Sequence, residues 1–393
     1  MPGRDFLQVP GPTNIPGRVL RAMDRPAVDH RGPEFIALTH RVLPKLREVF
    51  RTERGAPVIF MGSGTAGLEA ALVNTLSPGD RVLAFGIGHF SHLFARIAIR
   101  LGCEVELAEL PWGSVIPPDL VYDRLSADRE PRYKAVLAIH NETSTGVTCD
   151  IPAIREAMDR AGHPALLLVD TISGLGSIDF RFDEWGVDVA VAGSQKGLLL
   201  PPGLTILAVS DRALRAGESA RLPRHFFDWA PVIEFNRKGF FPFTPATLLL
   251  FGLDEALDLL QEEGLEQVYA RHALLGEGVR RAVEAWSLPL VAQERATASD
   301  VVTGIRLPEG HDAARVPELS AERYGLSLGI GIGPLQGKAF RIGHLGSLNE
   351  LEVLAVLGGV EMTLDTLGVP VPLGEGVTAC QRWFLSRSAP VAG

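Results

Sequence analysis

One lysine occupies a position that does not suit a charged side chain. Lys196 follows an apolar run ending in Gly193-Ser194-Gln195, and Leu198-Leu199-Leu200 comes shortly after it. An ammonium group among small and apolar neighbours must be compensated or lose its proton. A lysine with a lowered pKa is a nucleophile and can form a Schiff base with a carbonyl compound. We therefore predict Lys196 as a covalent catalyst.

A carboxylate ends a second apolar run. Asp170 follows Leu166-Leu167-Leu168-Val169 and precedes Lys196 by 196 − 170 = 26 residues, the length of a strand–helix–strand unit. A carboxylate in that position is costly unless it meets a cation. We expect Asp170 and Lys196 at neighbouring strand ends on one edge of a sheet. A turn or helix-capping aspartate is the structural alternative.

A glycine-rich turn precedes a predicted helix. Gly62-Ser63-Gly64-Thr65-Ala66-Gly67 matches the dinucleotide pattern G-x-G-x-x-G. NAD(P) binding also needs an acidic residue after the second strand, and Gly86-Ile87-Gly88-His89-Phe90 contains none. A single phosphate fits the free amides and positive dipole of such a helix start. A tight turn without a ligand is the alternative.

Pyridoxal 5′-phosphate has the three groups that these elements would hold. Its phosphate would lie on Ser63-Gly64-Thr65 and its aldehyde on Lys196. Its pyridinium nitrogen would pair with Asp170, which keeps the ring protonated as an electron sink. Phe90, just after another predicted strand, offers an aromatic ring for stacking.

The elements that must position these residues alternate between apolar strands and amphipathic helices. Strands that are apolar on both faces predict a mostly parallel sheet covered by helices, with the chemistry at the carboxyl ends of the strands. The predicted strands are Val58–Met61, Arg81–Phe85, Val105–Leu110, Ala135–His140, Leu166–Asp170, Val187–Ala192 and Thr205–Val209. The predicted helices are Ala66–Leu76, His92–Leu101 and Ile151–Ala161.

The second half of the chain predicts a smaller α+β domain. Residues 211–246 suggest an irregular segment, and a helical stretch from Leu248 to Trp286 is broken near Gly264. The strands Val301–Leu307 and Phe340–Gly343 and the helices Ala314–Tyr324 and Glu350–Leu367 follow. We predict an α/β fold with a large domain over residues 15–255. The small domain would hold residues 256–393, with residues 1–14 packed against it.

Composition narrows the class of partner. The net charge is −9, so counterion release from nucleic acid gives little binding energy. The 3 cysteines are scattered and the histidines have no zinc spacing, so we expect reduced thiols and no metal. Neither a signal peptide nor a membrane-spanning segment is visible, and we expect a cytoplasmic protein.

A set of short strings is distributed along the whole chain. Its members are Pro10-Gly11-Pro12-Thr13-Asn14, Ser63-Gly64-Thr65, His140-Asn141-Glu142-Thr143-Ser144-Thr145-Gly146, Val169-Asp170-Thr171, Gly193-Ser194-Gln195-Lys196 and Arg341-Ile342-Gly343-His344-Leu345-Gly346. This set resembles the class V aminotransferases, above all the alanine/serine–glyoxylate aminotransferases and their bacterial serine– and aspartate–glyoxylate branch, and the resemblance covers essentially the whole chain.

The resemblance implies a fold-type-I pyridoxal-phosphate transaminase that works as a homodimer with active sites at the subunit interface. Lys196 would be its Schiff-base lysine and Asp170 the partner of the ring nitrogen. The other implied contacts are Phe90 on the ring, Thr143 on its phenolic oxygen, Gln195 near the phosphate, Thr244 on the phosphate of the other subunit, and Arg341 on the substrate α-carboxylate. Gly11 and Pro12 would line the substrate side.

Two positions depart from the family pattern. Phe241 and Phe243 stand where relatives often carry a phosphate-binding tyrosine, and Phe90 stands where many carry tryptophan. These changes predict weaker cofactor binding with the chemistry retained. The expected reaction transfers an amino group from serine, alanine or aspartate to glyoxylate. A pyruvate-accepting or ureidoglycine transaminase remains an alternative.

Other activities fit the residues less well. A cysteine desulfurase needs a reactive cysteine ahead of the carboxylate-binding arginine, and residues 320–341 contain none. An NAD(P)-dependent oxidoreductase lacks its acidic residue. A cofactor-binding regulator would need a DNA-binding segment, and an inactive scaffold would not need the polar groups that are present.

Overall fold

Seven strands form the central sheet of the larger part of the molecule. The structure is a computed structural model that describes residues 5–387; residues 1–4 and 388–393 of the predicted small domain lie outside that range. The strand order is β2-β10-β9-β8-β5-β3-β4. The bounds are β2 Ala56–Gly62, β3 Arg81–Gly86, β4 Glu104–Glu109, β5 Tyr133–Ile139, β8 Leu166–Asp170, β9 Val189–Gly193 and β10 Gly203–Val209.

The sheet is parallel apart from one strand. β10 pairs antiparallel with both β2 and β9, whereas β9, β8, β5, β3 and β4 pair parallel with one another. The predicted mostly parallel sheet is thus confirmed, and β8 has the predicted bounds. The carboxyl ends of the parallel strands therefore meet at one edge, where the chemistry of such sheets is placed.

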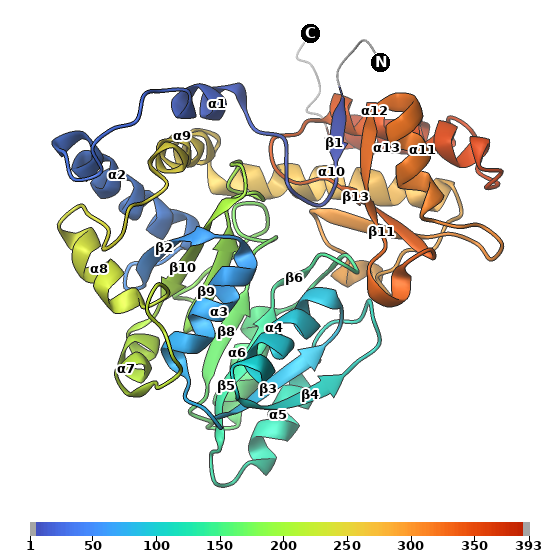
Figure 1. Cartoon of the computed structure of the whole chain (residues 1–393). Coiled ribbons are helices and arrows are strands. Elements are labelled where there is room, and N and C mark those ends of the chain that lie inside the picture. Colours follow the sequence, from blue (N-terminus) through green and yellow to red (C-terminus); the bar gives the residue numbers. More distant parts are fainter. Residues whose placement is uncertain (1–4, 388–393) are drawn as a thin grey trace.

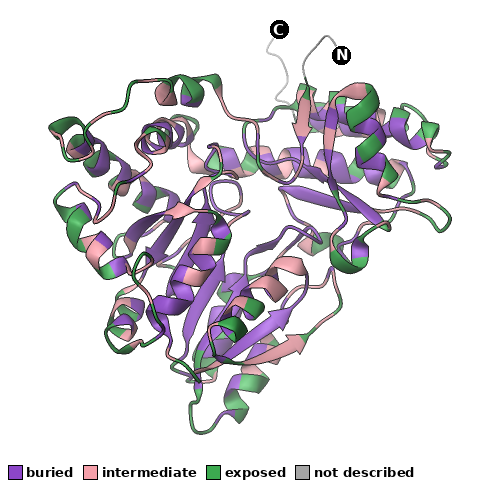
Figure 2. Cartoon of the chain, viewed as in Figure 1, coloured by how far each residue is buried: buried purple, intermediate pink, exposed green. Residues whose placement is uncertain are grey.

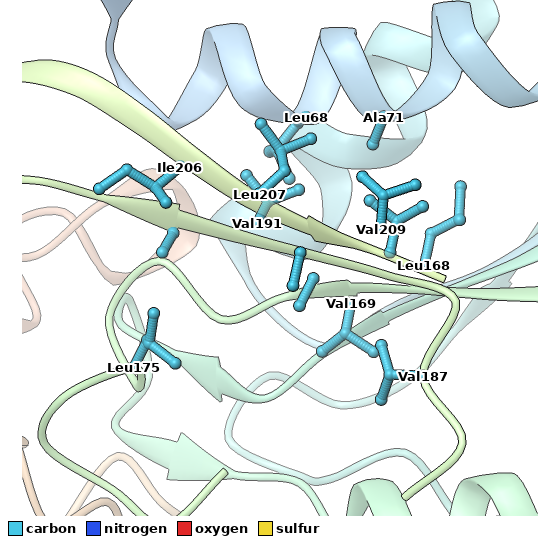
Figure 3. Close-up of a cluster of buried hydrophobic side chains, with 14 of the residues drawn as sticks. Leu68, Ala71, Leu168, Val169, Leu175, Val187, Val191, Ile206, Leu207 and Val209 are labelled. Carbon is cyan, nitrogen blue, oxygen red and sulfur yellow. The ribbon is translucent and has the colours of Figure 1, made fainter. Parts of the chain in front are cut away.

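Nine helices of the described chain accompany this sheet. Figure 3 shows Leu68 and Ala71 of α3 facing Val191, Leu207 and Val209 of the sheet, with Val169 and Val187 on the other side of the strands. The bounds are α1 Gly17–Met23, α2 Pro33–Phe50, α3 Gly64–Thr75, α4 His89–Arg100, α5 Pro118–Ala127, α6 Ile151–Arg160, α7 Asp211–Ser219, α8 Trp229–Arg237 and α9 Thr247–Glu263.

A four-stranded sheet forms the centre of the smaller part. Its order is β1-β12-β13-β11, with bounds β1 Phe6–Gln8, β11 Val302–Arg306, β12 Leu326–Ile330 and β13 Ala339–Gly343. Helices α10 Leu265–Ala285, α11 Arg315–Tyr324, α12 Glu350–Thr366 and α13 Glu375–Arg387 belong to it, with short 3-10 turns at Arg295–Thr297 and Gly333–Leu335. Figure 1 shows the N-terminal strand beside this sheet, and β1 pairs parallel with β12.

The two sheets have separate hydrophobic cores, visible as the buried strands of Figure 2. Apart from Ala292, the first core extends along the chain to Val268, and the second begins at Leu275, so the change falls within α10. The predicted boundary at residues 255 and 256 stays a prediction. A helix shared by both cores couples the positions of the two sheets.

The segment 211–246 corrects one prediction. Instead of an irregular stretch it contains α7 and α8, capped by the side chains of Ser210 and Asp228. Its aromatic residues pack on one another and on β2; for example, the Phe227 and Phe60 ring centroids are 5.5 Å apart. The break near Gly264 is confirmed, because α9 ends at Glu263 and α10 begins at Leu265.

Candidate active site

A cavity of about 250 Å³ lies at the carboxyl edge of the large sheet. The ends of β2, β5, β8 and β9 contribute to it, together with the starts of α3 and α4 and part of the N-terminal segment. Ten of the twelve predicted site residues line it: Gly11, Pro12, Ser63, Gly64, Thr65, Phe90, Thr143, Asp170, Gln195 and Lys196. The fold thus gathers residues that are up to 196 − 11 = 185 positions apart.

Lys196 reaches the cavity from the turn after β9. Its Nζ donates a hydrogen bond to the Pro10 carbonyl, and no carboxylate of the described residues forms an ion pair with it. Burial lowers the pKa of Lys196 to about 8; the Arg341 charge also lowers it, and Asp170 opposes the change. A substantial fraction of this amine is therefore neutral and nucleophilic near pH 8.

Asp170 lies at the end of β8, with 3% of its surface exposed. Its Oδ1 accepts one hydrogen bond, from the Ile172 N–H at 2.9 Å. Burial raises the pKa of Asp170 to about 7, and the charge of Glu142 adds to the rise, while the Ile172 N–H and Lys196 oppose it. A buried carboxylate so poorly compensated suits a cation placed in the cavity.

The N-terminus of α3 opens into the same cavity. Its N-cap residue, Ser63, makes no side-chain capping bond, although the Ser63 carbonyl accepts from Ala66 and Gly67. A side chain at Gly64 would collide with Ile172, because its Cβ would lie 2.5 Å from Cδ1. The backbone of this turn therefore faces the cavity without a covering side chain. Phosphate groups bind to backbone N–H groups in this arrangement at helix N-termini.

Arg341 approaches the site from the small sheet, although it does not line the cavity. Nε donates to the Ile330 carbonyl and Nη1 to the Thr143 carbonyl, both at 2.9 Å. Only 6% of the residue is exposed, and burial lowers its pKa to about 10. Within residues 5–387 no acid pairs with this guanidinium, so it is a buried cation that lacks a counterion.

Thr244 does not join the others. It is exposed and lies outside the cavity, in the turn before α9. The neighbouring Phe243 ring stacks on Phe226 with centroids 4.6 Å apart, and Phe241 is buried. The two phenylalanines thus pack in the aromatic cluster of the large domain. The predicted role of Thr244 toward a second subunit stays a prediction.

Two polar residues of the cavity received no role from the sequence. Asn141 Nδ2 donates to Ser173 Oγ at 2.8 Å, and Thr143 Oγ1 donates to the same oxygen at 2.7 Å. Ser173 Oγ in turn donates to the Asn141 carbonyl at 3.0 Å. Their position after a strand could have identified them as site residues, because Ser173 follows the end of β8 and Asn141 follows the end of β5. No rule of sequence spacing, however, connects the two residues with each other.

The Phe90 ring and the backbone of Gly11 also line the cavity. Phe90, in the first turn of α4, packs edge to face against His89 with centroids 5.1 Å apart. Gly11 has a φ of +103°, and a Cβ there would lie 2.5 Å from Lys196 Nζ. Only glycine combines that conformation with such a close approach to the lysine.

No helix among residues 5–387 has the length and apolar content needed to cross a bilayer. In the same part of the chain, no cluster of three or more histidine, cysteine, aspartate or glutamate side chains could hold a metal ion.

Comparisons of the sequence point to one family. The family model described as aminotransferase class-V matches residues 6–329. The serine–glyoxylate aminotransferase of Methylorubrum extorquens is 49% identical over 100% of this chain and 98% of its own length. The L-aspartate–glyoxylate aminotransferase of Paracoccus denitrificans is 45% identical over 99% of this chain and 98% of its own.

Solved structures show the same architecture. Pyridoxamine–pyruvate aminotransferase from Mesorhizobium loti superimposes with a TM-score of 0.91 at 31% identity, covering 98% of each chain. Ureidoglycine–glyoxylate aminotransferase from Bacillus subtilis gives 0.90 at 29% identity, over 98% of this chain and 99% of that one. The mostly parallel sheet with a smaller second domain is thus the fold of aminotransferases.

Proposed function

The chain belongs to the class-V aminotransferases, and from this premise we propose that it transfers the amino group of a small amino acid to glyoxylate. The products are glycine and a 2-oxo acid, and the cofactor is pyridoxal 5′-phosphate. The observation that carries the proposal is the placement of Lys196 and Asp170 in one cavity with the open start of α3. The relatives that act on serine or aspartate with glyoxylate support the choice of substrates.

The residues present fit this cofactor. Pyridoxal phosphate supplies an aldehyde that an amine can trap and a cationic ring that withdraws electrons from the substrate carbon. Ser63, Gly64 and Thr65 would hold the phosphate at the start of α3, with Gln195 beside it. Phe90 would stack on the ring, and Thr143 would bond its phenolic oxygen.

Lys196 performs the proton transfer in this proposal. Its Nζ would act as the base: when it is free and neutral, it would remove the proton from the donor α-carbon and hold it for return. The lowered pKa near 8 keeps this amine available as a base at neutral to mildly alkaline pH. Asp170 would accept the N–H of the cofactor ring, and an ionised carboxylate there would hold that proton in place.

Arg341 selects the acid group of the substrate. Its Nε and Nη1 are held by two backbone carbonyls, so the guanidinium has a fixed orientation before substrate arrives. A carboxylate that bonds it in the two-pronged manner would satisfy this buried cation. Gly11 and Pro12 line the cavity from the N-terminal segment, on the side where a small donor such as serine, alanine or aspartate would lie.

The proposal includes assembly and location. The chain would work as a homodimer in the cytoplasm, with Thr244 of each subunit reaching the phosphate bound by the other. Thr244 is exposed, next to aromatic residues that include Phe226, which is 40% exposed. All three cysteines are free and buried, which suits a reducing compartment.

A panel of donors tests the substrates. Purified enzyme with pyridoxal phosphate and glyoxylate should form glycine from serine, alanine or aspartate, and Lys196→Ala should abolish turnover and borohydride trapping of the cofactor. Glycine formation by the Lys196→Ala variant would disprove the roles. Faster turnover with ureidoglycine, or with pyruvate in place of glyoxylate, would favour the second candidate, which the structural similarity to the B. subtilis and M. loti enzymes supports.

A further inference from the structure

No side chain of helix α4 itself caps the first N–H groups of the helix, because Ser91 Oγ bonds the backbone of the N-cap residue instead. Its N-cap residue is Gly88, which has no side chain, yet the first three N–H groups of the helix are all bonded. The His89 N–H donates to Ser144 Oγ at 2.9 Å, and the N–H groups of Phe90 and Ser91 donate to Glu142 Oε2 at 3.1 and 2.9 Å. A helix normally receives such bonds from its own N-cap residue. Here they come from the end and the turn of a short hairpin after β5, formed by β6 Asn141–Glu142 and β7 Val147–Thr148, more than 50 residues later.

The Glu142 carboxylate is fully buried and no cation pairs with it. Its exposed fraction is 0%, and within residues 5–387 no lysine, arginine or histidine forms an ion pair with it. Its Oε1 accepts from the Ser144 N–H at 3.0 Å and the Ser144 hydroxyl at 2.6 Å. Every donor is therefore a backbone amide or a hydroxyl, with the positive end of the α4 dipole behind them. Burying a carboxylate in this way is costly unless the whole set of bonds is made.

Gly88 provides the space for this carboxylate. A Cβ on Gly88 would lie 2.5 Å from both Cγ and Cδ of Glu142, and 2.7 Å from Ser144 Oγ. Gly88 has an extended φ of −179°, which any residue can adopt, so glycine is required for room and not for conformation. Glycine at position 88 thus has two effects: it provides no capping side chain, and it leaves the space in which the Glu142 carboxylate caps the helix instead.

The same turn reaches two groups of the proposed active site. Glu142 bonds the backbone of Phe90, whose side chain lines the cavity. The next residue, Thr143, gives its carbonyl to Arg341 Nη1. By contrast, the start of α3 at the same sheet edge has no side-chain cap and opens into the cavity. The start of α4 is therefore capped by the carboxylate of Glu142, whereas the start of α3 remains free to bind the anion of a ligand.

We propose that Glu142 is a positioning residue, which with Ser144 closes the start of α4 and so fixes Phe90 against the cofactor. The cofactor part of this proposal rests on the proposed function. The Glu142 side chain itself does not line the cavity. Its effect passes through the amides of Phe90 and Ser91, so its loss should move the ring of Phe90 while leaving Lys196 and Asp170 in place.

Glu142→Gln is the primary test. Both carboxylate oxygens face donors, so either orientation of the amide directs an N–H at another N–H or O–H group. We expect pyridoxal phosphate to bind the cofactor-free variant about tenfold to a hundredfold more weakly. The circular dichroism of the bound cofactor should also decrease, because the ring loses its fixed orientation. Amide hydrogen exchange at Phe90 and Ser91 should be faster before any cofactor is added.

Gly88→Ala is the second variant, because its Cβ displaces the same carboxylate without changing any polar group. The matched control is Asp150→Ala. Asp150 caps α6 by accepting the Ala153 N–H at 2.9 Å, and it is exposed and outside the cavity. The control should lose about 1 kcal/mol of stability and keep wild-type cofactor affinity and dichroism.

The outcomes separate the two proposals. Wild-type cofactor affinity and dichroism in Glu142→Gln overturn the positioning role, even if the variant is less stable. If Glu142→Gln does not fold, Gly88→Ala decides by the same criterion. A wild-type chain that binds no pyridoxal phosphate overturns the proposed function instead; unchanged exchange at Phe90 and Ser91 would then also overturn the capping role.

Discussion

Asp170 is placed for function at the expense of stability. In the cofactor-free chain its folded pKa of about 7 lies above the ordinary value of 3.8, because burial disfavours the charged form. Between these values the folded state holds a proton that the unfolded state has lost, so stability falls as pH rises through this window and the loss is complete above pH 7. The penalty amounts to a few kcal/mol, on the order of 1.4 kcal/mol per unit of pKa.

Replacement of this residue should therefore stabilise the chain without cofactor. We expect cofactor-free Asp170→Asn to unfold a few degrees higher than wild type at pH 8, with the difference shrinking toward pH 4, where Asp170 is protonated. Thermal unfolding across that pH range measures it. Equal stability at pH 8 would contradict the burial argument. With pyridoxal phosphate added, the order should reverse, because the variant lacks the carboxylate that we propose as the partner of the ring nitrogen.

The residues of the site were predictable to different degrees. Lys196 and Asp170 stand out because each follows an apolar strand, and strand order then brings them together. The contact between Arg341 and the Thr143 carbonyl spans 198 positions and depends on how two sheets pack, which no local pattern encodes. The burial of Glu142 could not be predicted from the sequence for a related reason. A glutamate in a polar motif is ordinarily solvated, and its burial depends on the bare backbone of Gly88.

The helices and strands were also predictable where local sequence determines them, and were not where contacts with distant residues determine them. β8 could be placed from its apolar run, whereas α4 begins three residues before the predicted His92, because its capping groups lie on Glu142 and Ser144. β10 was predicted as a strand, yet its apolar pattern does not distinguish parallel from antiparallel pairing. In segment 211–246 the aromatic and proline content obscured two short helices that pack on β2 and α3.

The packing of helix α3 on the sheet should determine the position of the proposed phosphate site. A Cβ on Gly67 would lie 2.1 Å from Thr205 Oγ1 and 2.6 Å from Val191 Cγ1, so α3 lies directly on β9 and β10 there. Alanine in place of a helical glycine ordinarily stabilises by up to about 1 kcal/mol. At Gly67 the sign should reverse: we expect a loss of about 1–3 kcal/mol from overpacking and weaker pyridoxal phosphate binding as the start of α3 shifts.

Gly358 of α12 provides the control for this substitution. A Cβ there would meet nothing closer than Val377 at 4.0 Å, so Gly358→Ala should be neutral or stabilising and leave the cofactor unaffected. Denaturant unfolding and cofactor titration of both variants measure the effect. A Gly67→Ala chain that is as stable as Gly358→Ala would contradict the close packing of α3 on the sheet.

At the scale of the whole molecule, two buried histidines occupy the junction between the cores. His272 Nδ1 donates to the Val268 carbonyl, and its Nε2 accepts the Gly346 N–H at 3.0 Å. His344 Nδ1 donates to the Asp300 carbonyl, and its Nε2 accepts the Thr303 hydroxyl at 2.9 Å. Both rings are therefore neutral, with their acceptor nitrogens already used. Burial, the largest cause in each case, lowers both pKa values to about 3.

These histidines should make the folded chain sensitive to acid. Below pH 6.5 the unfolded state takes up protons that the folded state does not, so stability present above that pH is lost as pH falls. At pH 5 the loss is about 2 kcal/mol per histidine. The double variant His272→Gln, His344→Gln should lose less stability between pH 7 and pH 5, although it starts lower because hydrogen bonds are missing.

Denaturant unfolding at a series of pH values gives this slope. His40→Gln, at an exposed position on α2, serves as the control and should keep the wild-type slope. A double variant with the wild-type slope would show that acid acts elsewhere, for example at the buried His140, whose pKa burial lowers to about 4.

Assembly is the largest scale, and it decides whether one chain completes its own site. Thr244 is exposed and outside the cavity that holds Lys196, so we expect it to serve the cavity of a second subunit. Thr244→Ala homodimers should bind pyridoxal phosphate about tenfold to a hundredfold more weakly, since one hydrogen bond to a charged group is lost. Lys196→Ala homodimers should be inactive. The informative species is the heterodimer of these two variants, isolated through different affinity tags.

In that heterodimer the subunit that retains Lys196 faces a partner that retains Thr244. If the threonine acts across the interface, one site lacks both groups and the other lacks neither, so half of the wild-type activity returns with wild-type cofactor affinity. If Thr244 acted within its own chain, the site with the lysine would lack it, and the affinity would equal that of the Thr244→Ala homodimer. Cofactor titration of the purified heterodimer therefore distinguishes the two arrangements, and a monomeric wild-type chain that still turns over at full rate would contradict both the shared site and the dimer.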